Sequence, residues 1–206
     1  MTRFFKYLLT CAVAMLMVFS SLNAQKKGWV KLFDGKSLDG WKVGENDTTF
    51  KVKDGAIVVF GPRAHLFYDG PVQNHSFKNF EYKATVMTKP GANSGMYIHT
   101  TYQEKGWPEK GYEIQVNNSH TDWRRTGSVY GIQDVKEPPA KDDKWFTQHI
   151  IVQGNKITVK VDGKTINEYT VPAEGGKLST GTFALQGHDP KSMVFYKDIM
   201  VKVLPD

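Results

Sequence analysis

Two-residue turn signals, placed between short runs of β-branched and aromatic residues, constrain the fold of this chain more than any other feature. Asp54-Gly55 separates two such runs, Asp162-Gly163 separates another two, and Gly154-Asn155 precedes the second hairpin. Asp-Gly and Gly-Asn pairs provide the positive φ angles that tight hairpins need. The sequence therefore predicts a chain that folds mainly as antiparallel hairpins.

The spacing of apolar residues supports the same fold class. From residue 80 to residue 87, apolar side chains alternate with Glu81, Lys83 and Thr85, as on a strand with one buried face. Helical spacing is nearly absent beyond residue 24, and 19 Gly and 9 Pro punctuate the runs. With no internal repeat or linker, the sequence predicts one antiparallel sandwich or barrel. Four large aromatic residues are assigned to its core: Trp29, Phe33, Trp41 and Trp145.

The first 24 residues have the pattern of a secretory signal peptide. Arg3 and Lys6 precede an uncharged apolar run, residues 7–19, and a small residue, Ala24, ends the segment. An uncleaved membrane anchor is the alternative, but the run is short for a bilayer span. We expect cleavage after Ala24, a domain over residues 25–206 with no stable membrane span, and a periplasmic, cell-surface or secreted location.

Composition excludes several classes of function. Cleavage would remove Cys11, the one cysteine, so disulfide and thiol chemistry are not expected. It would also remove two of the 27 basic residues and none of the 21 acidic ones, leaving a dispersed net charge of +4. That pattern gives no electrostatic footprint for nucleic acid. The six histidines show no metal-ligand spacing, so no metal or cofactor is expected. The oligomeric state is not indicated.

Six sequence blocks, in order, cover nearly all of the expected mature chain: residues 28–41, 80–82, 90–98, 111–115, 127–131 and 181–188. Together they resemble the 3-keto-disaccharide hydrolase family, formerly known only as a domain of unknown function. The resemblance implies a concanavalin-like jelly roll of two curved antiparallel sheets. It also implies action on 3-keto-glucosides, either by hydrolysis or by splitting to a 2-hydroxy-3-keto-glucal that is then hydrated. His99 departs from the family, whose members often carry Arg there.

The strand around Gly111-Tyr-Glu-Ile-Gln-Val-Asn117 carries the row Glu113, Gln115 and Asn117 on one face. An ordinary glycosidase needs two carboxyl groups, so a second would have to come from a loop, as from Asp122 or Glu104. A ketone at carbon 3 changes this requirement, because it acidifies the proton on carbon 2. One base, donors for the enolate oxygen and an acid for the leaving oxygen then suffice.

We expect Glu113 to be the base, with His99 and His188 as further catalytic groups, since imidazole titrates near neutral pH. Strand alternation places Tyr97 with His99 on one face, and Gln186 with His188 on another. If these faces line one side of a sheet, the groups converge on a site that takes a sugar. The residues expected to bind the substrate there are Tyr97, Gln115, Gln186, Trp107, Trp123, Arg124, Tyr130 and Asn93.

Competing interpretations stay open for each of these residues. Glu113 and Gln115 could be the solvated face of a sheet, His188 a turn residue and Asn93 part of a turn. The aromatic residues could pack in the core or in loops. The function expected first is an exported enzyme that cleaves 3-keto-glycosides, by elimination and hydration or by net hydrolysis. The alternative is a non-catalytic carbohydrate-binding jelly roll.

Overall fold

The computed structural model describes residues 28–174 and 179–206. The expected signal peptide, residues 1–24, lies outside this range. Within it, no helix is long and apolar enough to cross a membrane. The secondary structure is almost entirely β, with two short 3₁₀ turns, η1 (Asp47–Thr49) and η2 (Val72–His75).

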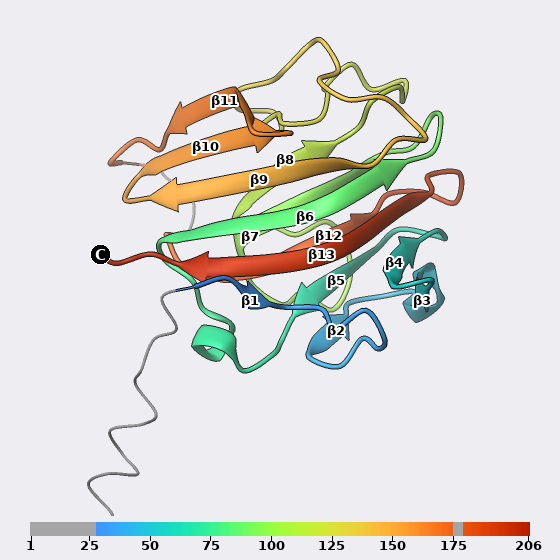
Figure 1. Cartoon of the computed structure of the whole chain (residues 1–206), viewed down its shortest axis with the longest axis horizontal. Helices are drawn as coiled ribbons and strands as arrows, with labels where there is room; N and C mark the ends of the chain where they lie inside the picture. The colour runs from blue at the N-terminus through green and yellow to red at the C-terminus, as the bar shows by residue number, and fades with distance from the viewer. Residues whose placement is uncertain (1–27, 175–178) are drawn as a thin grey trace, which may run out of the picture.

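Two antiparallel sheets form the two layers of the fold (Figure 1). The larger sheet has the order β11-β10-β9-β6-β13-β4-β3, with β1 paired to β13. Its longest strands, β6 and β13, lie at its centre. Its strands are β1 (Val30–Lys31), β3 (Phe50–Lys53), β4 (Ala56–Val59), β6 (Phe80–Thr88), β9 (Phe146–Gln153), β10 (Lys156–Val161), β11 (Lys164–Thr170) and β13 (Val194–Val203).

The smaller sheet has the order β2-β5-β12-β7-β8. Because β12 lies between β5 and β7, it brings a late segment of the chain next to two early ones. These two sheets confirm the predicted jelly-roll sandwich. The five strands are β2 (Trp41–Val43), β5 (Ala64–Tyr68), β7 (Ser94–Thr100), β8 (Tyr112–Val116) and β12 (Thr182–Gly187).

The turn signals lie where the sequence places them. Asp54 and Gly55 have φ angles of 51° and 76° and join β3 to β4. Asp162 and Gly163, with φ angles of 48° and 80°, join β10 to β11. Positive φ at both turn positions matches the right-handed twist of the strands they connect. The turn sequence therefore sets the register at the start of each hairpin, and a bulge between Val159 and Lys160 shifts it farther along β10 and β11.

The core lies between the sheets and is rich in aromatic residues. Tyr82 of β6 stacks on Phe183 of β12, with ring centroids 4.1 Å apart, and Phe77 stacks on the same ring at 4.4 Å. All three side chains are fully buried. Burial on this scale contributes roughly 1.5–3 kcal/mol per large apolar side chain. These ring contacts therefore hold the smaller sheet in place against the larger one.

Two of the four aromatic residues assigned to the core lie elsewhere. Phe33 and Trp41 are buried as predicted, but Trp145 is 41% exposed and Trp29 is half-buried. The indole of Trp145 lies under the Lys197 ammonium, 4.2 Å away, and that of Trp29 lies under Lys83 at 4.0 Å. Aromatic rings can cover a sheet surface in this way when a lysine covers them in turn.

Candidate active site

The smaller sheet turns one face to the core and the other away from it. Tyr97 of β7 lies opposite Glu113 of β8 and also opposite Ala184 of β12. One step along, Gln186 of β12 lies opposite His65 of β5. Since side chains alternate along each strand, these groups share the outward face. The sheet therefore gathers a carboxylate, a phenol, an amide and an imidazole from four strands.

Glu113 is the centre of this group. Its Oε2 accepts a hydrogen bond from the Tyr97 hydroxyl at 2.8 Å, and its Oε1 accepts one from Gln186 Nε2 at 2.7 Å. With its amide nitrogen turned to the neighbouring acceptors, Gln115 also donates to Glu113 Oε1 at 3.1 Å and to the Ser94 carbonyl at 3.0 Å. These three donors fix the orientation of the carboxylate.

Gly95 provides the space that this carboxylate occupies. A Cβ atom at position 95 would lie 2.4 Å from Glu113 Oε1 and 2.8 Å from Glu113 Cγ. Cβ atoms do not approach nonbonded heavy atoms that closely, so any larger residue at position 95 would displace the Glu113 side chain. Because Gly95 has no side chain, the Glu113 side chain can lie across β7 toward Gln186.

Tyr97 stays protonated in this setting. Burial raises the pKa of its phenol far above the ordinary value, and the negative charge of Glu113 raises it further. Gln186 Nε2 also lies 3.3 Å from the Tyr97 hydroxyl. Tyr97 is therefore a permanent hydrogen-bond donor to Glu113, and proton exchange with a substrate falls to other groups.

A pocket of about 270 Å³ opens over this network. Backbone hydrogen bonds from residues 127–130 to the free edge of β8 bring Tyr130 beside it, with Tyr130 N bonded to the Glu113 carbonyl at 3.0 Å. Glu113 is the one carboxylate among the residues that line this pocket. All eight are residues that the sequence singles out: Asn93, Tyr97, Trp107, Glu113, Gln115, Tyr130, Gln186 and His188.

His188 reaches the pocket from the end of β12. Its Nδ1 lies 2.8 Å from Asp189 Oδ2, which fixes the ring and leaves Nε2 as its other polar atom. The indole of Trp107 packs against it, with ring centroids 5.3 Å apart. Burial would raise the pKa of Asp189, but hydrogen bonds from His188, Ser192 and the Lys191 amide outweigh it and hold the value at about 2.

His99 does not reach the pocket. β7 has one more residue than β12 between the pairs Tyr97–Ala184 and Thr100–Thr182, and His99 has a φ of 50°. This bulge breaks the alternation, so the prediction that His99 shares the face of Tyr97 is wrong. Its Nε2 lies 2.9 Å from the Lys78 carbonyl oxygen, and its ring packs edge-on against Phe80 in the core.

Trp123 and Arg124 are also absent from the pocket lining. Trp123 is 48% exposed. The Arg124 guanidinium lies over the ring of Trp123 at 5.0 Å and over that of Tyr130 at 4.8 Å, and its Nε bonds to Asp134 at 3.2 Å. Arg124 therefore supports the wall that Tyr130 forms, instead of facing the pocket itself.

The two loop acids considered as partners for Glu113 do not line the pocket either. Asp122 Oδ2 accepts the Tyr130 hydroxyl at 2.9 Å, and Glu104 is exposed. Burial would raise the pKa of Asp122, but the Arg124 amide, the Tyr130 hydroxyl and the Arg124 guanidinium outweigh it, and the value falls below its usual range. Asp122 is thus an ionised anchor for Tyr130.

Asn117 directly follows β8 and is the third polar residue of the row that begins with Glu113 and Gln115. It anchors a loop instead of facing the pocket. Its Oδ1 accepts a hydrogen bond from the His120 amide at 2.8 Å, and its Nδ2 donates to the carbonyls of Asp122 and Arg124. It is fully buried. Because these bonds fix residues 118–127, they also set the position of the His120 ring.

Four residues at the site escape the sequence interpretation. Gly95 and Asp189 carry no signal that separates them from ordinary turn and strand residues, and His120 lies in an irregular loop. His65 is buried on β5, with its ring 5.5 Å from Tyr97 and 5.6 Å from Trp107. Burial lowers the pKa of His65 to about 4, so its ring is neutral at physiological pH. The pairing of His65 with Gln186 could have been found only from strand order.

Comparison with known families agrees with this geometry. A family model for a 3-keto-alpha-glucoside-1,2-lyase-like domain matches residues 28–202. A 3-keto-disaccharide hydrolase from Bacteroides thetaiotaomicron is 25% identical to this chain, over 89% of this chain and 81% of that protein. Both findings confirm the resemblance carried by the six sequence blocks.

Solved structures confirm the fold. A candidate glycosyl hydrolase from Parabacteroides distasonis superposes with a TM-score of 0.73 at 22% identity, covering 86% of this chain and 94% of that one. A carbohydrate-binding module from Bacillus subtilis superposes with a TM-score of 0.60 at 13% identity, covering 79% and 95%. The names of the relatives indicate a carbohydrate-active protein of the glycosyl hydrolase type.

Proposed function

Because the chain belongs to the 3-keto-alpha-glucoside-1,2-lyase-like family, we propose that it cleaves the glycosidic bond of 3-keto-glycosides by elimination and hydration. The observation that carries this proposal is Glu113, the one carboxylate among the pocket-lining residues, held by Tyr97, Gln186 and Gln115. A site with this composition suits a reaction that needs one base and several donors.

The pocket composition argues against an ordinary glycosidase. Such enzymes place two carboxyl groups about 5–5.5 Å or about 6.5–9.5 Å apart across the scissile bond. Here Asp122 is bonded to Tyr130, and neither it nor Glu104 is among the lining residues. A substrate that carries its own electron sink, the ketone, removes the need for the second carboxylate.

In the proposed reaction Glu113 takes the proton from carbon 2 of the sugar. The electrons of that C–H bond form the enolate and then the C1=C2 double bond, while the bond from carbon 1 to the glycosidic oxygen breaks. The leaving oxygen takes a proton. Among the residues that line the pocket, His188 is the one whose ring N–H can supply it. Addition of water across C1=C2 then gives the 3-keto sugar. The net change is hydrolysis of the glycoside.

The remaining lining residues suit a sugar ring. Trp107 and Tyr130 offer aromatic surface for its C–H face, and both are partly exposed at the pocket, at 44% and 37%. Asn93 and Gln115 offer amide groups for hydroxyls. Gln186 lines the pocket, and its Oε1 atom has no hydrogen-bond partner among the described residues, so it is available to accept a hydrogen bond from a substrate hydroxyl.

Aglycone release from a 3-keto-glucoside or from 3-keto-trehalose tests the proposal. Glu113→Gln keeps the shape of the side chain but removes the base, so we expect kcat/KM to fall by at least about 10²-fold. Glu104→Gln makes the same change at an exposed carboxylate and is the matched control. Equal loss in both variants, or none in either, contradicts the role of Glu113. Binding of a glycan without turnover of any keto sugar would favour the carbohydrate-binding alternative.

We also propose that the protein is exported after cleavage at Ala24. The support is the charged start, the apolar run and the small residue before Gln25. Expression of the full chain in a Gram-negative host, followed by N-terminal sequencing of the periplasmic fraction, should give Gln25 as the first residue. An intact N-terminus in the membrane fraction would contradict it.

A further inference from the structure

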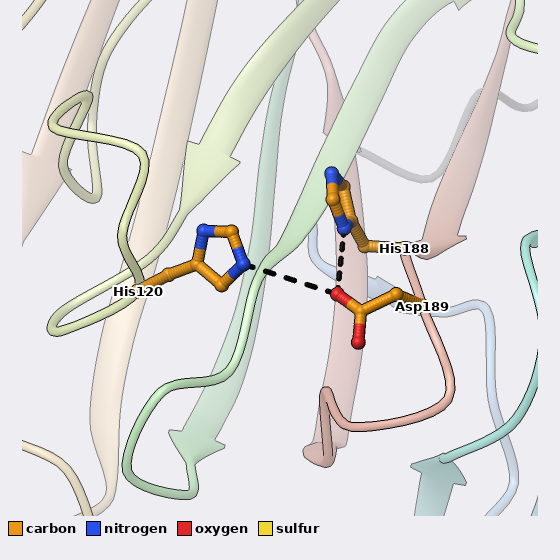
Figure 2. Close-up of side chains that lie close together, drawn as sticks. All are labelled: His120, His188 and Asp189. Atoms are coloured by element: carbon orange, nitrogen blue, oxygen red, sulfur yellow. Dashed lines mark hydrogen bonds and ion pairs between the residues drawn. The ribbon is translucent and has the colours of Figure 1, made fainter.

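Two histidines and an aspartate come together at the edge of the pocket (Figure 2). His188 and Asp189 follow β12 directly, and His120 comes from the loop that Asn117 anchors. One ligand atom from each lies within 4.8 Å of the others. His188 Nδ1 is 2.8 Å and His120 Nε2 is 3.9 Å from Asp189 Oδ2, so both rings face the same carboxylate oxygen.

This donor set matches a divalent transition metal. Imidazole nitrogens suit Zn²⁺, Co²⁺, Ni²⁺ and Fe²⁺, and one carboxylate beside two imidazoles offsets part of the charge of the cation. Three protein ligands also leave coordination positions open, as catalytic sites do. The separations of 2.8 and 3.9 Å from Asp189 Oδ2 lie on either side of the roughly 3.3 Å between neighbouring ligand atoms of a tetrahedral cation with metal–nitrogen bonds of about 2.0–2.1 Å.

The carboxylate is held by groups outside the ligand set. Asp189 Oδ1 accepts hydrogen bonds from the amides of Lys191 at 2.7 Å and Ser192 at 3.1 Å, and Oδ2 accepts one from Ser192 Oγ at 2.8 Å. The same Ser192 Oγ accepts a hydrogen bond from Asn93 N at 2.9 Å. Partners of this kind orient metal ligands and raise metal affinity.

The His120 ring has a defined second partner as well. Its Nδ1 lies 3.0 Å from the Asp122 amide, which donates to it, and 3.4 Å from the side-chain amide of Asn93. A cation on Nε2 requires the ring proton to lie on Nδ1, so metal binding would break the hydrogen bond that the Asp122 amide donates to Nδ1. The Asn93 amide can then turn its oxygen to that proton and its nitrogen to the Gln115 oxygen, 3.2 Å away. This places Asn93 and Gln115 between His120 and Glu113.

We propose that His120, His188 and Asp189 bind a divalent transition-metal cation at the edge of the pocket. The role of the cation rests on the proposed function. The elimination needs an electrophile for the ketone oxygen, and His99, predicted from the sequence to be a catalytic group, lies in the core. His188 lines the pocket, so open positions on the cation can face the sugar. Coordination through Nδ1 leaves the Nε2–H of His188 available for the leaving oxygen.

Direct metal binding tests the site without any substrate. The untagged protein is stripped with a chelator and titrated with Zn²⁺, Mn²⁺ and Co²⁺ by calorimetry, with Co²⁺ also followed by its visible absorption. We expect about one equivalent per chain, and we expect His120→Gln and Asp189→Asn each to weaken binding by at least about tenfold. His75→Gln changes an exposed histidine away from the pocket and should leave the affinity unchanged.

No saturable binding, or equal affinity in the protein with and without the His120 and Asp189 substitutions, overturns the proposal. Circular dichroism identifies a variant that fails to fold, and because Asp189 holds a turn, His120→Gln is the decisive variant. Stoichiometric binding without turnover of keto sugars would support the metal site and contradict the proposed function. Full keto-glycoside turnover in the chelated protein would overturn the role assigned to the cation.

Discussion

Acid should destabilise this protein in part through one buried histidine, His65. The ring is 2% exposed, lies against Tyr97 and Trp107, and its Nε2 has no hydrogen-bond partner among residues 28–174 and 179–206. Burial is the main cause of its lowered pKa of about 4. Of the nearby charges, Glu45 raises that value, whereas Arg63 and His188 lower it. The folded protein therefore resists protonation of a group that the unfolded chain protonates readily.

The sign and size of the effect follow from linkage. An unfolded histidine has a pKa of about 6.5, so as the pH falls below that value the unfolded state binds the proton first and gains stability. The penalty is absent at pH 8, reaches about 2 kcal/mol at pH 5 and approaches about 3.4 kcal/mol below pH 4. For a domain of this size, about 2 kcal/mol corresponds to roughly 4–8 °C in Tm.

Thermal or urea unfolding at pH 8 and pH 5 measures it. His65→Gln removes the titrating group, so its loss of unfolding free energy between these pH values should be smaller than that of the unmodified protein by about 2 kcal/mol. His75→Gln, at an exposed histidine, should follow the unmodified protein. Parallel pH dependence for the unmodified protein and His65→Gln would refute the reasoning.

Three further substitutions test how the site is built. Gly95→Ala places a methyl group 2.4 Å from a Glu113 oxygen, so kcat/KM on a 3-keto-glucoside should fall by about 10²-fold with the fold intact by circular dichroism; unchanged activity would contradict the cradle. His99→Asn keeps a residue that tolerates positive φ but removes the ring from the core. The free energy of unfolding in urea should therefore fall by about 1–3 kcal/mol, while kcat/KM stays within about threefold. A loss of activity without a loss of stability would indicate that His99 acts in the active site. Asn117→Ala removes the four side-chain hydrogen bonds that join Asn117 to the 118–127 loop, so urea unfolding should show a loss of about 2–3 kcal/mol. A loss below about 0.5 kcal/mol would contradict the anchor role.

The sequence predicts this fold well because its signals are local. Asp54-Gly55 and Asp162-Gly163 define hairpins through their own φ angles, and the alternation of residues 80–87 marks the buried face of β6. Alternation along β8 places Glu113 and Gln115 on one face in the same way. Each of these inferences depends on neighbours in the chain.

What the sequence could not predict depends on strand order and on small irregularities. The insertion of β12 between β5 and β7 places Gln186 beside Glu113 and His65, and no spacing in the sequence encodes that order. One extra residue in β7 moves His99 from the pocket face to the core. Burial of Trp145 is also predicted wrongly from the sequence, because Lys197 covers its ring on the surface of the sheet.

The His120–His188–Asp189 group illustrates the limit for sites. His120 and Asp189 are 69 positions apart, on loops that follow different strands, so no ligand spacing exists to detect. Asn117 brings the first loop to the pocket, and the turn around Ser192 fixes the second. Only the folded arrangement of the sheet makes these two loops neighbours.

Exchange of the proton on carbon 2 tests most directly whether Glu113 is the base. The protein is incubated with a 3-keto-glucoside in D₂O, and deuterium at carbon 2 of the recovered sugar is followed by NMR together with aglycone release. We predict deuterium incorporation with the unmodified protein and with Glu104→Gln, and loss of both signals with Glu113→Gln. Aglycone release that continues without any deuterium at carbon 2, or exchange that survives Glu113→Gln, would contradict the account.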